Sequence, residues 1–103
     1  MKKGDTVQAS EKAYKVAEEI VKALAEKFNT LEYQQEGKWY AYTLGNVAYE
    51  LSKTLGDWLN KGWVTAYYLH VWGFHEGKLK DIEGYVKTVK EMYEKAKKIL
   101  TES

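Results

Sequence analysis

The sequence predicts an all-α protein, an up-and-down bundle of four helices that forms one domain over residues 1–103. Proline, the residue that most strongly interrupts helices, is absent. Strong helix formers recur throughout, and apolar residues return every three to four positions, which is the period of an amphipathic helix. Turn signals divide this periodic pattern into the expected helices.

The first helix is expected from Thr6 to Phe28. Asp5 is expected to cap it, with Gln8 three residues later in a pattern close to a capping box. The opposite face carries unlike charges four residues apart, beginning with Glu11 and Lys15, which is typical of a solvated surface. The apolar positions share a broad inner face: Ala13, Tyr14, Ala17, Ile20, Val21, Leu24, Ala25 and Phe28.

A polar connector, residues 29–37, precedes a second helix from Lys38 to Leu55. Gly45 within it costs about 1 kcal/mol relative to alanine and therefore indicates close packing. Gly56 is expected to end this helix and Asp57 to cap the next, so the two helices should be antiparallel neighbours. The inward residues are Tyr40, Leu44, Val47, Ala48, Leu51 and Leu55.

The third helix, from Trp58 to Glu76 with Gly77 ending it, is apolar around most of its circumference. Such a helix is normally surrounded by protein, yet a four-helix monomer leaves one face of each helix open. We therefore expect a two-fold homodimer, with the small residues allowing the partner's backbone to approach. Its faces hold Leu59, Trp63, Tyr67, His70 and Phe74; then Val64, Tyr68, Val71 and His75; and the small residues Gly62, Ala66 and Gly73.

The fourth helix is expected from Ile82 to Leu100, with Asp81 as its cap. Lysine and glutamate alternate four residues apart on its outer face, which indicates a solvated surface. Its inner stripe is Ile82, Tyr85, Val86, Val89, Tyr93, Ala96 and Leu100.

The composition excludes several classes of protein. All 16 basic residues are lysine, 15 residues are acidic, and the net charge is +1. Arginine is the side chain that most often recognises guanine in DNA, through two parallel hydrogen bonds. Because the chain has none, we expect no sequence-specific DNA binding. No cysteine is present, so disulfides and thiolate metal sites are impossible. No apolar run approaches the roughly 18 residues of a spanning helix, and the start is too polar for a signal peptide. We expect no membrane contact and a cytoplasmic location.

The two histidines fall within residues 69–79, a stretch rich in aromatic rings. On an α-helix, His70 and His75 lie about 140° apart and point in different directions, so we expect no metal site and no cofactor. Neither a Gly-x-Ser-x-Gly motif nor a phosphate loop is present. His70 and His75 are the candidates for general acid–base chemistry. The competing interpretation is a buried His70 bonded to a neighbouring helix and a His75 that balances the helix dipole. The candidate binding residues are Tyr67, Trp72, His75, Glu76 and Lys78.

Two motifs, Gly4-Asp5-x-x-Gln8-Ala9-Ser10-Glu11-Lys12 and His70-x-x-Gly73-Phe74-His75-Glu76, resemble the archaeal PaREP family of paralogous-repeat helical proteins. Gly37-Lys38-Trp39 resembles the start of that family's second helix, and the similarity covers nearly the whole chain. The resemblance implies a HEPN-like bundle. Such bundles often dimerise; some pair with nucleotidyltransferases, and others cleave RNA with an Arg-polar-x₃₋₅-His motif. This chain has no arginine, so the resemblance does not extend to that ribonuclease motif.

Three hypotheses follow. The first is a non-enzymatic, homodimeric interaction module with a protein, nucleotide or RNA partner, whose recognition surface centres on residues 75–78. The alternative is an enzyme of the HEPN type lacking the arginine motif, a phosphodiesterase or nucleotide-acting enzyme with His70 or His75 as its base. The third is a purely structural dimer in which both histidines are satisfied internally.

Overall fold

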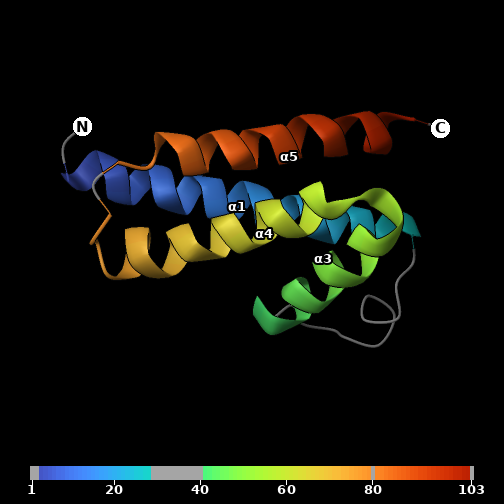
Figure 1. The fold of residues 1–103 in the computed structure, drawn as a ribbon, viewed down its shortest axis with the longest axis horizontal. Coiled ribbons are helices and arrows are strands. Elements are labelled where there is room, and N and C mark those ends of the chain that lie inside the picture. Colours follow the sequence, from blue (N-terminus) through green and yellow to red (C-terminus); the bar gives the residue numbers. More distant parts are fainter. Residues whose placement is uncertain (1–2, 29–40, 80, 103) are drawn as a thin grey trace.

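The computed structural model describes residues 3–28, 41–79 and 81–102, and the regular elements in these ranges are all helical. They are α1 (Lys3–Phe28), α3 (Ala41–Leu55), α4 (Asp57–Tyr68), the π-helix η1 (Leu69–His75) and α5 (Glu83–Thr101). Leu69 keeps helical dihedral angles, so η1 continues α4 without a break. The described residues thus form four helical rods, which confirms the predicted all-α bundle (Figure 1).

Three of these rods lie side by side, and α3 is inclined to them (Figure 1). α4 and η1 run in the opposite direction to α1 and α5. α1 contacts η1, α5, α4 and α3, while α4 also contacts α3 and α5. The arrangement places η1 against the first half of α1, near the turn that leads into α5.

The core consists of the predicted inner faces with a few exceptions. Leu24, Leu44 and Leu59 are fully buried at the contacts of α1, α3 and α4. Phe28, at the end of α1, is 42% exposed, and Tyr85 and Tyr93 on the predicted inner stripe of α5 are exposed as well. Met92 is buried in their place. The predicted stripe of α5 was therefore right for Ile82, Val89 and Ala96 and wrong for the two tyrosines.

The helix ends differ from expectation at the acidic residues that were expected to cap them. α1 begins at Lys3, so Asp5 lies inside the helix and is not its cap. Gly56 precedes α4 with φ 123°, and Asp57 is the first residue of the helix, where its charge still favours the dipole. Asp81 lies one residue before the N-cap of α5, which is Ile82, but its Oδ1 still accepts a hydrogen bond from the Glu83 amide at 3.2 Å. The predicted connector at 29–37, the start at Lys38 and the inward Tyr40 lie outside the described residues.

The small residues of α4 and η1 face other helices of the same chain. A Cβ added at Gly62 would lie 2.7 Å from the Met92 Cβ on α5. One added at Gly73 would lie 2.8 Å from the Ser10 Cβ on α1. The expectation that this strip receives a partner's backbone is therefore wrong, since the chain's own helices occupy it.

Gly45 on α3 behaves as its sequence position predicted. An added Cβ would lie 3.2 Å from the Trp63 indole nitrogen, so glycine here allows α3 to pack closely on α4. In the part of the chain that the structure describes, no helix has both the length and the apolar character that crossing a bilayer requires.

Candidate functional site

The π-helix brings the two histidines together. In a π-helix each backbone N–H bonds to the carbonyl five residues earlier, so residues five apart lie much closer around the axis than they do in an α-helix. The Glu76 amide bonds in this way to the Val71 carbonyl at 3.0 Å. The Nε2 atoms of His70 and His75 are consequently 3.1 Å apart. The expectation that the two rings point in different directions was wrong, because it assumed α-helical winding.

Glu11 on α1 completes a chain of polar groups. Its Oε1 lies 3.3 Å from Nδ1 of His70. The two side chains are 24% and 21% exposed, so solvent only partly screens them. Glu11 was expected on a solvated face beside Lys15, and that expectation was wrong because α1 turns this residue toward η1. One signal was available in the sequence: Glu11 is three residues before Tyr14, which lies at the edge of the predicted inner face.

Two aromatic rings pack nearly parallel to the His70 imidazole. Tyr14 stacks on it with 3.9 Å between ring centroids and 19° between planes. The Phe74 ring lies nearly parallel to that of His70, with 5.9 Å between their centroids. Trp63 extends the column, since its ring is 5.6 Å from that of Tyr14. Stacked rings of this kind fix the plane of the imidazole, so the direction of both its nitrogens is set by packing.

Tyr14 is a support and not a reactive group. Burial, with a smaller contribution from the neighbouring Glu18 carboxylate, raises the pKa of its hydroxyl from 10.0 to about 12. The phenol therefore keeps its proton throughout the physiological range. It contributes shape and stacking to the site.

One assignment of protons satisfies the whole chain of groups. His70 donates its Nδ1–H to the Glu11 carboxylate, which leaves Nε2 of His70 with a lone pair directed toward His75. His75 then donates its Nε2–H to that lone pair. This assignment follows from the network of partners. The arrangement can pass a proton along the three groups, or it can present two imidazole nitrogens to a third body. We call Glu11, Tyr14, His70 and His75 the histidine site.

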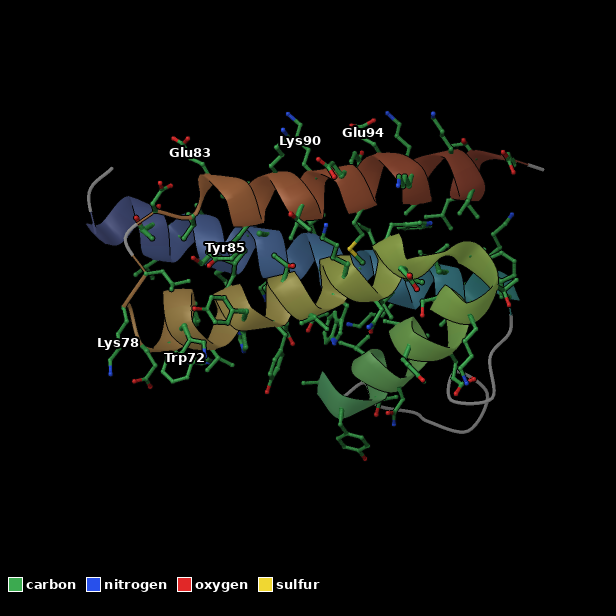
Figure 2. The ribbon with its side chains drawn as sticks, viewed as in Figure 1. Trp72, Lys78, Glu83, Tyr85, Lys90 and Glu94 are labelled. Atoms are coloured by element: carbon green, nitrogen blue, oxygen red, sulfur yellow. The ribbon has the colours of Figure 1, made fainter. Side chains whose placement is uncertain are left out.

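The other predicted binding residues separate into two groups. Tyr67 joins the histidine site, with its ring 6.2 Å from that of His70. Glu76 and Lys78 pair at 3.9 Å, and both are well exposed, so this ion pair contributes little stability. Trp72 lies near Lys78 at the same end of the molecule (Figure 2). The five predicted binding residues therefore lie on two adjoining surfaces and do not form a single cluster.

An apolar surface adjoins this end of the molecule. We call it the aromatic face: Val64, Tyr68, Trp72 and Tyr85, which are 56%, 39%, 42% and 39% exposed. The rings of Tyr68 and Tyr85 are 5.3 Å apart, so the face joins α4 to α5. Side chains as large as these are usually covered when they gather on one surface.

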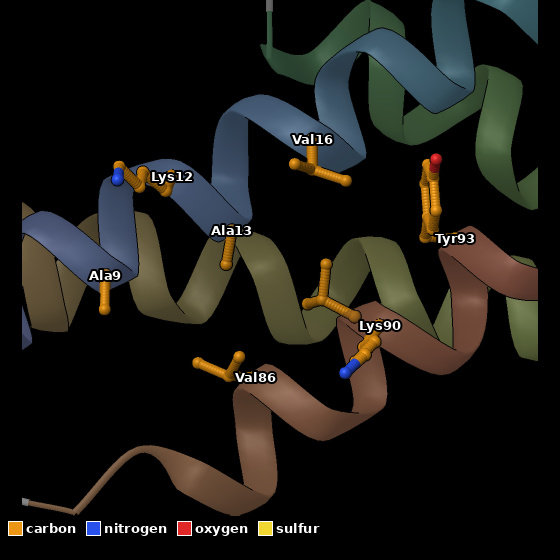
Figure 3. Close-up of a pocket in the computed structure, with 8 residues that line it drawn as sticks. Ala9, Lys12, Ala13, Val16, Val86, Lys90 and Tyr93 are labelled. Carbon is orange, nitrogen blue, oxygen red and sulfur yellow. The ribbon is translucent and has the colours of Figure 1, made fainter.

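A groove between α1 and α5 forms a second apolar surface (Figure 3). Its volume is about 380 Å³, and it opens to solvent. Val16 and Tyr93 form one end, and the Lys12 and Lys90 side chains border it. The groove is lined by Ala9, Lys12, Ala13, Val16, Val86, Val89, Lys90 and Tyr93.

The two sequence motifs that contain Glu11, His70 and His75 fall within a region that matches a known protein family. Neither the curated proteins nor the solved structures contain a match. The model of the archaeal PaREP1/PaREP8 family matches residues 1–93, a range that includes Glu11, both histidines and the aromatic face. This chain therefore belongs to the archaeal PaREP1/PaREP8 family.

Proposed function

We propose that the protein is a cytoplasmic, HEPN-like, homodimeric interaction module without enzymatic activity of its own. The observation that carries this proposal is the aromatic face. Val64, Tyr68 and Trp72 follow one another at four-residue intervals along α4 and η1, and Tyr85 extends the surface onto α5. Aromatic residues are enriched and lysine is depleted at the centre of protein interfaces.

A second copy of the chain is the occupant that best fits this face. The four members of the face carry no charge, and the Lys61 and Asp81 side chains that line the hollow beside Tyr85 are of opposite sign, so the face favours an uncharged partner surface over a strongly charged ligand. A two-fold axis through it would place Tyr68 and Tyr85 of one copy against the same residues of the other, as isologous interfaces require. The net charge of +1 imposes no strong repulsion between copies.

The substitution Tyr68→Glu is expected to abolish dimerisation. A carboxylate at the centre of an apolar interface loses its hydration on binding, and loss of a central aromatic residue commonly costs 2 kcal/mol or more, about thirtyfold in the dissociation constant. Analytical ultracentrifugation at tens of micromolar should give twice the 12.0 kDa chain mass for the parent protein and the single mass for the variant.

Val16→Glu is the matched control, because Val16 is 41% exposed and lies in the other apolar surface, the groove. This variant should remain dimeric. A parent protein that sediments as a monomer would refute the proposed dimer. Loss of the dimer in Val16→Glu alone would move the interface to the groove.

A further partner, a protein or a nucleotide or RNA, is proposed to bind beside the dimer interface. Glu76 and Lys78 are exposed there together with His75, Trp72 lies near Lys78, and Tyr67 adjoins this surface through His70. A glycine at positive φ, Gly77, fixes the turn that carries these polar groups. Thermal-shift screening with nucleotides and short RNAs tests this surface, since a ligand that binds the native state raises its melting temperature. Any ligand found must lose its effect in Lys78→Ala.

One observation favours an enzyme as the second candidate. A base oriented by a second group, which is itself oriented by a carboxylate, is the arrangement that activates nucleophiles in many enzymes. His75, His70 and Glu11 follow that order. The substrate class would be a phosphodiester or nucleotide. Purified protein that cleaves RNA and loses this activity in His75→Gln would support the candidate, and protein that cleaves none across pH 5–8 would remove it.

A further inference from the structure

We propose that the histidine site binds one borderline divalent metal ion, such as zinc, through Nε2 of His70 and Nε2 of His75. The inference is independent of the dimer, because both ligands and their supporting residues belong to one chain. It also differs from what the sequence alone predicts, since α-helical winding would separate the two rings.

The distance between the nitrogens suits a shared ion. Two imidazole nitrogens bound to tetrahedral zinc at about 2.0–2.1 Å lie about 3.3 Å from each other. The two Nε2 atoms here are 3.1 Å apart. Widening this distance by a few tenths of an ångström and turning the exposed His75 ring would admit the ion.

The rings are not yet oriented as a pair that binds one ion, so binding requires a rotation. Two imidazoles bound to one tetrahedral ion have their ring centroids about 5 Å apart. Here the centroids are 4.4 Å apart, with 79° between the ring planes. His75 can make this rotation because its side chain is exposed.

Glu11 and the aromatic column prepare His70 as a ligand. Metal-binding histidines usually donate their second ring N–H to a carboxylate, which fixes the tautomer and strengthens the metal bond. Glu11 accepts from Nδ1 of His70 at 3.3 Å, so the free lone pair of His70 is on Nε2. Tyr14 stacks on the same ring and keeps it from rotating. The carboxylate also supplies one negative charge near the proposed ion.

The donor set selects the class of metal. Imidazole nitrogens favour zinc, nickel and copper, whereas magnesium and calcium favour oxygen ligands. The chain has two histidines and no cysteine, so no other imidazole or thiolate competes. Within the described ranges 3–28, 41–79 and 81–102, no three histidine, aspartate or glutamate side chains lie close enough together to bind one ion. Water would therefore fill the remaining positions on the side where His75 is exposed.

The test uses the full chain without an affinity tag, titrated with zinc chloride. Long-range ¹H–¹⁵N spectra resolve the two imidazoles, and both Nε2 resonances should shift together as one ion binds per chain. Magnesium chloride at the same concentrations should leave them unchanged. Calorimetry should give one zinc ion per chain, and the monomeric variant Tyr68→Glu should bind with unchanged affinity.

Variants separate the ligands from their surroundings. His75→Ala should abolish stoichiometric binding while the far-ultraviolet circular dichroism stays native, because His75 is exposed. Glu11→Gln should weaken binding about 10- to 100-fold, the usual effect of removing a carboxylate behind a ligating histidine. Glu76→Gln is the matched control, an exposed acid next to His75 in sequence, and should change nothing.

Three results would overturn the inference: zinc affinity unchanged in His75→Ala, an effect of Glu76→Gln as large as that of Glu11→Gln, or imidazole resonances that zinc does not move. None of these results bears on the dimer, whose test is the sedimentation of Tyr68→Glu without added metal. Failure of the metal site and failure of the dimer are therefore distinguishable.

Discussion

Gly73→Ala is expected to lower the free energy of unfolding by about 2–3 kcal/mol, at the upper end of what overpacking a core usually costs. The added methyl group would lie 2.8 Å from the Ser10 Cβ and would also overlap the Ser10 hydroxyl oxygen. Gly73 and Ser10 are both buried where η1 crosses α1, so neither side has room to yield. Chemical denaturation followed by circular dichroism measures the effect.

The same substitution should also disturb the histidine site. Pushing η1 away from α1 separates His70 from Glu11, whose hydrogen bond is already 3.3 Å long. A second substitution, Ser10→Gly, tests this explanation because it removes the side chain that the new methyl group would meet. By itself it should lower the free energy of unfolding by about 1 kcal/mol, since glycine is unfavourable inside a helix. In that background Gly73→Ala should be nearly neutral. A loss of stability that persists in the double variant would show that the contact with Ser10 is not its cause.

Gly62→Ala is the second substitution with a large expected effect, a loss of about 1–3 kcal/mol. Its methyl group would lie 2.7 Å from the Met92 Cβ, where α4 crosses α5. The flexible end of methionine can rotate away, but its Cβ cannot, so the two helices must separate. In a domain of this size each kcal/mol corresponds to about 4–8 °C in melting temperature, which calorimetry resolves.

Gly84→Ala is the control for this experiment. It makes the same chemical change within α5, but nothing lies within 4 Å of the added Cβ. Alanine in place of a helical glycine should then stabilise the protein by about 0.5–1 kcal/mol. If Gly62→Ala stabilises the protein as Gly84→Ala does, the close approach of α4 and α5 is refuted.

The sequence was sufficient to predict the helices because each has its own periodic pattern. Positions such as Ala17, Leu24 and Val47 were placed in the core correctly, since their spacing leaves one face for them. Gly56 and Gly77 correctly marked the ends of helices, and both have positive φ. The helix start near Asp5 was displaced by three residues and the one near Asp57 by one, because a capping preference of about 1 kcal/mol is easily outweighed by continued helix formation.

The histidine site could be predicted only in part. His70 and His75 were singled out from their surroundings, but their distance depends on π-helical winding, which periodicity over so few residues does not distinguish from α-helical winding. Glu11 and Tyr14 reach the site from a helix about 60 residues earlier, and a contact of that sequence separation depends on how α1 packs against η1. The role of Gly73 likewise depends on Ser10, its neighbour across that contact.

The winding of η1 has a mechanical consequence. If residues 69–75 were rewound as an ordinary α-helix, the imidazoles would swing about 140° apart around the axis. The distance between the two imidazoles therefore depends on the local winding of the helix. Any ligand that binds both imidazoles would stabilise the π-helical winding, and any force that rewinds the segment as an α-helix would weaken the binding of that ligand.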